Sequence, residues 1–330
     1  MSENNKNSMS ASEAGRIAAT GFGGRRIRVL AYGGQGARCL VQDARYLYWS
    51  DRGDDTVTRL SKDGGVPFIL ATGQRWIREL TLADGWLYWA TRDSVLRTPA
   101  AGGDIEIIAE GQEGAQSVAV RGAEVVWTTF GDGLDTGEVK RTTLGSGRVM
   151  TIAQQQKQPA ALVVDAQNIY WANHGIKRPD YFKDGSIAFA PWAAGAAPVV
   201  VATDQRLASS TAVDDAWIYW MTGTSYDPPH RRGALRKRRK DGGAVVELAS
   251  WDWYESGALA LDETHAYWLQ AIHAGIFRVK KTGGDPEQIM AGNPDEDGVF
   301  PDSLLVDDRC VYWTARDSRK AGGAVFKTAK

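Results

Sequence analysis

The side chains best suited to acid–base or metal chemistry are three histidines and one glutamate. The histidines are His174, His230 and His273, and Glu255 lies between the last two. An imidazole exchanges protons near neutral pH and binds divalent metals, and a nearby carboxylate can act as a general base. We therefore take His230, His273 and Glu255 as candidate catalytic residues. The three histidines together are a candidate divalent-metal set, although long polar loops also gather histidines without any such role.

Aromatic residues accompany this polar set. Trp251, Asp252 and Trp253 lie in the segment SWDWYESG, and Trp76 lies in GQRWIREL. We expect both segments to be loops. Aromatic rings beside polar groups suit stacking on a sugar or another flat organic ligand. For any single tryptophan, the alternative is packing beneath a long loop. The candidate ligand-binding residues are His174, Trp253, Asp252, Trp251, Tyr226, Arg178, Trp76 and Gln270.

A repeated unit must position these residues. The segment LVQDARYLYWSDRGDDTVTRLSKDGGVPFILATGQ (residues 40–74) recurs in degenerate form, and each copy contains an anchor tryptophan. Short strands that recur at this period predict a β-propeller with four strands per blade. We predict an all-β, seven-bladed propeller over residues 23–330 as a single domain, preceded by a disordered extension over residues 1–22. The anchors, 38 to 49 residues apart, are Trp49, Trp89, Trp127, Trp171, Trp220, Trp268 and Trp313.

Each unit divides into four strands, A to D. Strand B holds a Tyr-Trp pair or its equivalent, which we expect in the core between blades. Strand C reads apolar-x-basic, and a glycine-containing turn leads to strand D. The turn between strands A and B is often opened by an aspartate. We expect these aspartates to be Asx-turn residues rather than catalytic ones: Asp43, Asp165, Asp214, Asp262 and Asp307.

The two ends of the chain share one blade. The last unit stops after strand C, at residues 326–328, and lacks a strand D. Residues 23–36, GGRRIRVLAYGGQG, match the strand D segment GGVPFILATGQ. We therefore predict that residues 26–31 form the outer strand of the blade containing Trp313, which removes two exposed sheet edges.

These Tyr-Trp units resemble the tyrosine-tryptophan-threonine-aspartate propellers, the low-density lipoprotein receptor class B-like repeats and their bacterial relatives. The resemblance covers residues 23–330 and rests on the Tyr-Trp pair. Only the first unit has an aspartate two residues after the tryptophan, Asp51, and the receptor propellers have six blades rather than seven. The resemblance implies the fold and transfers no function.

Loop lengths indicate which face carries the site. The loops between strands B and C vary most, as in ANHGIKRPDYFKDG (172–185) and MTGTSYDPPHRRG (221–233). Length variation on one face of a repeat array is typical of a working face. The B–C and D–A loops emerge on the same face, here called the top. We expect the site on the top face over blades 3 to 6.

Composition argues against several classes of protein. The formal net charge of −1 is unlike that of a dedicated nucleic-acid binder, and the basic run 231–240 coincides with a strand C. We expect both cysteines, Cys39 and Cys310, to be free thiols. The N-terminus lacks the apolar core of a secretory signal, and no stretch reaches the ~18 apolar residues of a membrane span. We therefore expect a soluble, cytoplasmic monomer that binds neither nucleic acid nor membrane.

Three functions fit these observations. The first is a binding scaffold for a small molecule, glycan or peptide in the top-face funnel. The second is a propeller enzyme, a lyase, hydrolase or cyclase, that uses the His/Glu cluster with or without a divalent metal. The third is a protein-interaction platform, which a large exposed apolar patch would indicate. GxSxG, HExxH and P-loop motifs are absent from the sequence.

Overall fold

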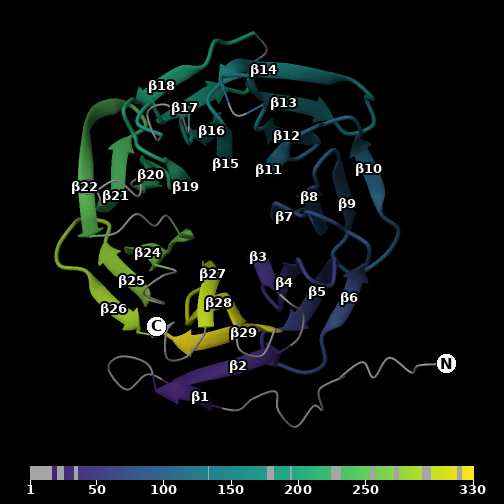
Figure 1. Ribbon diagram of the computed structural model, residues 1–330, viewed down its shortest axis with the longest axis vertical. Helices are drawn as coiled ribbons and strands as arrows, with labels where there is room; N and C mark the ends of the chain where they lie inside the picture. Colours follow the sequence, from purple (N-terminus) through teal and green to yellow (C-terminus); the bar gives the residue numbers. More distant parts are fainter. Residues whose placement is uncertain are drawn as a thin grey trace.

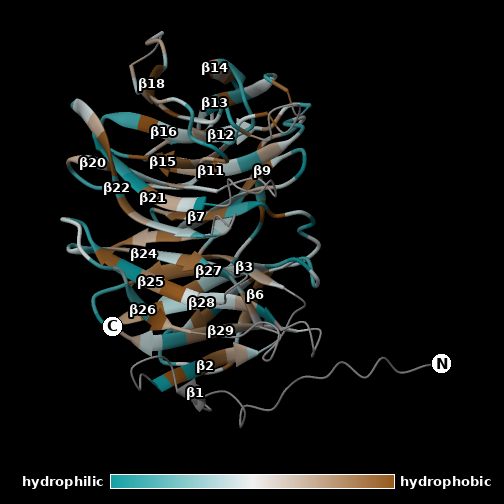
Figure 2. Ribbon diagram, turned by 60° about the vertical axis from the view of Figure 1, so that its left-hand side comes forward, coloured by the Kyte–Doolittle hydropathy of each residue, from teal (hydrophilic) through white to brown (hydrophobic). Residues whose placement is uncertain are grey.

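The computed structural model describes residues 17–20, 26–32, 36–132, 134–176, 182–193, 195–223, 232–252, 257–270, 275–291, 299–317 and 322–330. Seven antiparallel sheets stand around a central axis (Figure 1), which confirms the predicted seven-bladed β-propeller. Apolar stretches lie within the strands that stack from blade to blade (Figure 2). Among the described residues, no helix is long and apolar enough to cross a membrane.

The first three blades contain four strands each, ordered from the channel outward. Blade 1 consists of β3 (Ala37–Gln42), β4 (Tyr46–Asp51), β5 (Thr56–Ser61) and β6 (Phe68–Ala71). Blade 2 consists of β7 (Glu79–Ala83), β8 (Trp86–Ala90), β9 (Val95–Pro99) and β10 (Glu106–Ala109). Blade 3 consists of β11 (Ala115–Arg121), β12 (Glu124–Thr129), β13 (Gly137–Thr143) and β14 (Val149–Gln156).

Blades 4 to 6 repeat this order. Blade 4 consists of β15 (Pro159–Val164), β16 (Asn168–Asn173), β17 (Ser186–Pro191) and β18 (Val199–Ala202). Blade 5 consists of β19 (Ser209–Val213), β20 (Trp217–Thr222), β21 (Arg232–Arg239) and β22 (Gly242–Asp252). Blade 6 consists of β23 (Leu259–Leu261), β24 (His265–Gln270), β25 (Gly275–Lys280) and β26 (Glu287–Met290).

Blade 7 joins the two ends of the chain. Its inner strands are β27 (Val299–Val306), β28 (Cys310–Asp317) and β29 (Gly322–Ala329). Strand β2 (Arg26–Tyr32) pairs with β29, with Arg28 opposite Lys327, so the predicted closure by residues 26–31 is confirmed. A fifth strand, β1 (Ile17–Thr20), pairs with β2 and was not expected from the sequence.

The Tyr-Trp motif holds neighbouring blades together. Adjacent residues of a strand face opposite ways, so the tyrosine meets the following blade and the tryptophan meets the preceding one. Tyr48 of blade 1, for example, packs with Trp89 of blade 2. In blade 3 the tyrosine position holds Val126, which packs with Trp171. The expectation that these pairs form the core between blades is confirmed.

A glutamine secures most of these tryptophans. Gln74 accepts a hydrogen bond from the indole Nε1 of Trp89 at 3.1 Å and donates to the carbonyl of Thr72. The same bond joins Gln112 to Trp127, Gln156 to Trp171 and Gln205 to Trp220. In each case the glutamine precedes the tryptophan by 15 residues. The bond ties the end of one blade to the core strand of the next.

A second repeated network lies on the bottom face, at the A–B turns. Each of the five predicted turn aspartates accepts hydrogen bonds from backbone N–H groups through Oδ1 and from a tyrosine hydroxyl through Oδ2, as Asp262 does from His265 N and Tyr267. Their role as Asx-turn residues is therefore confirmed.

A lysine that follows strand C of the next blade completes the network at four interfaces. These ion pairs, at 2.6–3.0 Å, are Asp165–Lys240, Asp214–Lys281, Asp262–Lys330 and Asp307–Lys62. We call these Asp, Tyr and Lys residues the bottom girdle.

Other sequence expectations are also met. Cys39 and Cys310 are free thiols. The basic residues of β21 are engaged by the protein itself: Arg232 pairs with Glu247 at 2.6 Å, and Lys237 lies 3.9 Å from the centre of the Trp217 ring. These contacts fit a strand C whose basic side chains have a structural role within the blade.

Candidate functional site

Five arginines gather on the top face over blades 7, 1 and 2. Two positions of the repeat supply them. The position three residues after the anchor tryptophan is arginine in these three consecutive blades: Arg316, Arg52 and Arg92. The position eleven residues before the anchor, at the top of strand A, holds Arg38 and Arg78 in blades 1 and 2 and Asp302 in blade 7. We call Arg38, Arg52, Arg78, Arg92 and Arg316 the arginine cluster.

The charges of this cluster influence one another. Partial burial lowers the pKa of Arg78, and the positive charges of Arg52, Arg38 and Arg92 lower it further. Each neighbouring cation makes the protonated guanidinium less favourable. Arg78 is therefore close enough to Arg52, Arg38 and Arg92 for their charges to repel one another on the top face.

Asp302 offsets part of this positive charge. Arg38 forms an ion pair with Asp302 at 3.1 Å. Burial raises the pKa of Asp302 even though Arg38, Arg316 and Arg52 act in the opposite direction. Within the described residues, Arg52, Arg78 and Arg92 make no ion pair. The cluster thus keeps a surplus of positive charge that an anionic ligand could neutralise.

Trp76, one of the predicted ligand-binding residues, lies against this cluster. Its ring centre is 5.0 Å from the guanidinium carbon of Arg52 and 5.9 Å from that of Arg78. The side chain is 47% exposed. Its backbone has a φ of 62°, a strained conformation for a bulky residue that tends to occur at functional sites. Trp76 therefore offers a flat apolar surface beside the cations.

The loop that carries Trp76 is fixed at both ends. Before it, Gln74 receives the indole of Trp89, and its backbone N–H donates to the carbonyl of Asp55 at 2.8 Å. After it, the N–H of Arg78 donates to the carbonyl of Ala90 at 3.1 Å. These bonds hold the exposed ring in place without a ligand, which lowers the entropy cost of binding.

A chain of hydrogen bonds connects the top ends of neighbouring inner strands. Glu79, directly after Arg78, accepts a hydrogen bond from the hydroxyl of Ser117, whose oxygen in turn accepts from Leu162 N at 2.8 Å. Burial raises the pKa of Glu79 to about 7, although the bond from Ser117 acts in the opposite direction. A carboxyl with this pKa can exchange protons near neutral pH.

His174 is the one candidate histidine within the described residues. Its ring meets Phe130 edge-on, with 5.4 Å between ring centres. Burial lowers the pKa of His174 to about 4. The ring is therefore uncharged at neutral pH and packs against an aromatic neighbour.

Trp251, Asp252 and Gln270 lie at the top ends of strands. We expected Trp251 and Asp252 in a D–A loop, but both belong to the extended strand β22. Trp251 stacks on Trp268 with 5.7 Å between ring centres and packs against the core. Asp252 is exposed at the end of β22, opposite Arg232, and Gln270 is buried at the end of β24. Trp251 therefore packs against the core, which is the alternative to stacking on a ligand.

The remaining candidates lie outside the described residues: His230, His273, Glu255, Trp253, Tyr226 and Arg178. Within the part of the chain that the structure describes, no group of three or more His, Cys, Asp or Glu side chains could hold a metal ion. The described residues thus bring Trp76 together with the arginine cluster. None of these arginines is among the candidates identified from the sequence. The signal that could have found them is the recurrence of arginine at two fixed distances from the anchor tryptophan.

Comparisons with known proteins support the fold. No family model and no curated protein matches the chain. A streptogramin B lyase structure has a TM-score of 0.69 at 8% identity, covering 92% of this chain and 97% of the other. An oligogalacturonate lyase in complex with manganese has a TM-score of 0.67 at 13% identity, covering 95% and 94%. A chain of a nidogen/laminin complex has a TM-score of 0.51 at 16% identity, covering 72% and 90%.

These neighbours share the propeller architecture and include both lyases and a propeller from a protein–protein complex. The nidogen/laminin match agrees with the resemblance to the tyrosine-tryptophan-threonine-aspartate repeats. At such low identities, the comparisons establish the fold alone.

Proposed function

We propose that the chain is a binding scaffold whose top-face funnel takes an anionic small molecule or acidic glycan. The observation that carries this proposal is the arginine cluster: five guanidinium groups on three consecutive blades, of which Arg38 is paired with Asp302. Guanidinium groups bind carboxylates and phosphates through paired hydrogen bonds. A bound anion would relieve the repulsion that lowers the pKa of Arg78.

Trp76 narrows the class of ligand. A flat ring beside Arg52 and Arg78 suits a sugar ring that carries a carboxylate, because the ring can stack while the acid group meets the guanidinium groups. One structural neighbour is named as an oligogalacturonate lyase, and oligogalacturonate is an acidic oligosaccharide. The proposal keeps the predicted top face and anchors the ligand over blades 7, 1 and 2.

Calorimetric titration tests this proposal with trigalacturonate and with the neutral trisaccharide maltotriose. We expect trigalacturonate to bind and maltotriose to bind much more weakly, with an affinity for the acidic sugar that falls as salt rises. The double variant Arg52→Ala/Arg78→Ala should weaken trigalacturonate binding about tenfold or more. Equal affinities for the two sugars would contradict the proposal.

A matched control changes the same charge on the opposite face. Arg45 and Arg309 are exposed on bottom-face turns. The double variant Arg45→Ala/Arg309→Ala should bind trigalacturonate as the unmodified protein does. An equal loss of affinity in this control would show that net charge, rather than the cluster, governs binding.

One observation favours an enzyme as the second candidate. Glu79 has a pKa raised to about 7 and begins β7 directly after Arg78 of the cluster. A base beside guanidinium groups that hold a carboxylate suits proton removal next to that carboxylate, the first step of an eliminating lyase. Incubation with trigalacturonate should then give an unsaturated product with the unmodified protein and none with Glu79→Gln. If the unmodified protein binds the sugar and releases no product, the binding scaffold stands alone.

A further inference from the structure

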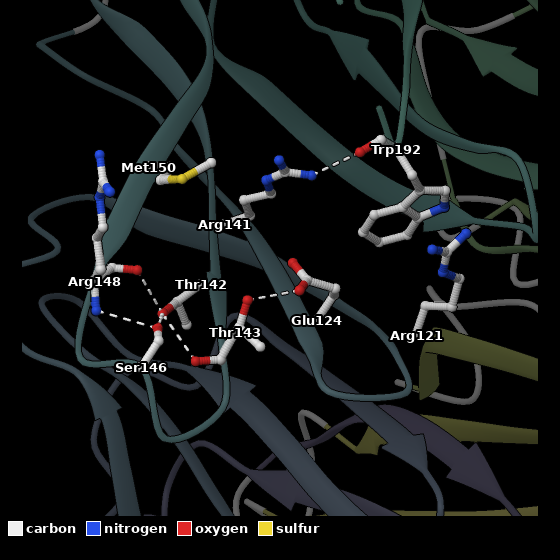
Figure 3. Close-up of a pocket in the computed structure, with 9 residues that line it drawn as sticks. All are labelled: Arg121, Glu124, Arg141, Thr142, Thr143, Ser146, Arg148, Met150 and Trp192. Atoms are coloured by element: carbon white, nitrogen blue, oxygen red, sulfur yellow. Dashed lines mark hydrogen bonds between the residues drawn. The ribbon is translucent and has the colours of Figure 1, made fainter. Parts of the chain in front are cut away.

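A second concave site lies on the bottom face, where blades 3 and 4 meet. It is a cavity of about 450 Å³ between the A–B and C–D turns of blade 3 and the end of strand C in blade 4 (Figure 3). Pockets that take small molecules commonly measure ~300–1,000 Å³. The cavity is on the face opposite the arginine cluster and is independent of the function proposed above.

The cavity is found where the bottom girdle changes. The position after strand C holds a lysine in blades 1, 5, 6 and 7, and Trp192 in blade 4. Blade 3 has Arg121 at the position that the turn aspartates occupy in other blades, six residues before the anchor tryptophan. Arg121 of this turn lies 4.2 Å from the centre of the Trp192 ring. A cation stacked on an indole thus stands where four other interfaces have an aspartate–lysine pair.

Trp192 is a preformed wall of this cavity. Its indole Nε1 donates to the carbonyl of Asp165 at 2.9 Å, and its own carbonyl accepts from Arg141 Nη1 at 2.8 Å. The residue is 9% exposed. In the view of Figure 3, Arg121 and Arg141 lie to either side of the indole. The aromatic surface is therefore held in place before any ligand arrives.

The lining carries excess positive charge. Three guanidinium groups, from Arg121, Arg141 and Arg148, face one carboxylate, Glu124, which accepts a hydrogen bond from Thr143 at 2.6 Å. Arg148 is exposed, and its guanidinium makes no hydrogen bond or ion pair with the described residues. Its backbone is fixed, because its carbonyl accepts from Thr142 at 2.8 Å. Arg148 is therefore a cation on a fixed turn that no described residue neutralises.

We propose that this cavity binds a small aromatic anion, a phosphate or carboxylate attached to a single ring. The acid group meets Arg148 and Arg141, because the guanidinium of Arg148 has no partner among the described residues and Arg141 uses only one of its several N–H donors on Trp192. The ring of the ligand lies between Met150 and Trp192, which supply the apolar part of the lining. An inorganic anion without a ring would contact only the guanidinium groups and would leave Trp192 uncovered.

Phenyl phosphate is the probe for this site. It is titrated calorimetrically into the Arg52→Ala/Arg78→Ala protein, so that the top-face cluster does not contribute. We expect one binding site per chain, weaker binding of inorganic phosphate, and no binding of phenol. Benzoate tests whether a carboxylate can take the place of the phosphate, and binding of either aromatic anion supports the site. The proposal would be overturned if neither aromatic anion binds, or if phenyl phosphate and inorganic phosphate bind with equal affinity.

Two variants locate the binding. Arg148→Glu should weaken phenyl phosphate binding about tenfold or more, whereas the control Arg45→Glu, on an exposed bottom-face turn of blade 1, should leave it unchanged. Trp192→Lys introduces the lysine that blades 1, 5, 6 and 7 have at this position and should remove the preference for phenyl phosphate over inorganic phosphate. Unchanged binding in Arg148→Glu contradicts the proposal, and this exposed position decides the question if Trp192→Lys does not fold.

Discussion

The bottom girdle divides the propeller into two parts. The four interfaces from blade 4 round to blade 1 are joined by aspartate–lysine pairs. The other three interfaces hold Ala100, Leu144 and Trp192 at the lysine position. Arginines link two of these three by donating to backbone carbonyls, as Arg59 does to Ala100 and Arg141 to Trp192. Among the described residues, the apolar core is therefore the only contact that every interface shares. Both candidate sites include blades in which the repeated polar contacts are replaced by others.

The largest effect should come from an anchor tryptophan, because all interfaces share that part of the core. Trp220 is fully buried and donates to Gln205 at 2.9 Å. Trp220→Ala should lower the free energy of unfolding by about 3–5 kcal/mol through the cavity it leaves. The control Trp76→Ala, at an exposed position, should cost less than about 1 kcal/mol. Urea unfolding measures both, and equal costs would show that the repeat has been assigned wrongly.

A girdle aspartate should give the next largest effect. Asp262 accepts from Lys330, Tyr267 and two backbone N–H groups. Asp262→Ala leaves these donors without their partner and should lower the free energy of unfolding by about 1–3 kcal/mol. Its neighbour Glu263 is exposed, so Glu263→Ala makes the same charge change and should stay within about 0.5 kcal/mol. If the two variants match, the girdle adds nothing to the stability of these four interfaces.

Acid should destabilise the girdle and His174 in different pH ranges. Burial disfavours the charged form of Asp307, yet bonds from Arg309 N, Lys62, Cys310 N and Tyr312 lower the pKa of Asp307 to about 2. Since the unfolded pKa is about 3.9, its contribution is present above about pH 4 and is lost as the pH falls toward 2. The pKa of His174 is lowered to about 4, so its contribution is lost between about pH 6.5 and 4.

Unfolding free energies measured across this pH range check both assignments. His174→Gln should flatten the upper range only, and Asp307→Asn the lower range only. If both variants change the free energy of unfolding over the same pH range, the assignment of His174 and Asp307 to different pH ranges is wrong.

The smallest effect on stability should come from the arginine cluster. Arg52→Ala removes one of several repelling cations and should change the free energy of unfolding by less than about 0.5 kcal/mol. The sign should be stabilising at low salt and vanish at high salt, because repulsion between exposed charges is screened. Thermal unfolding at two salt concentrations measures this difference. A large loss of stability would mean that Arg52 has a structural partner rather than a ligand.

The sequence was informative where a physical requirement repeats. Every blade needs a tryptophan in its core, so the series from Trp49 to Trp313 reveals the blade number. The turn aspartates are likewise recognisable because each one accepts the hydrogen bonds of its own turn. The arginine cluster was harder to predict, because Arg316 and Arg38 are far apart in the chain and act on the same carboxyl, Asp302, only when the ring closes. Trp251 was placed in a loop because the number of residues in strand β22 depends on pairing with β21, which no local pattern shows.

Closure by strand β2 has a consequence for how the protein is made. Strand β2 precedes blades 1 to 6 in the chain, and its partner β29 follows them. During translation β2 must therefore wait for this partner until the other six blades have been synthesised. Ring closure follows the synthesis of β29, and a truncated chain that lacks β29 keeps an open sheet edge that invites aggregation.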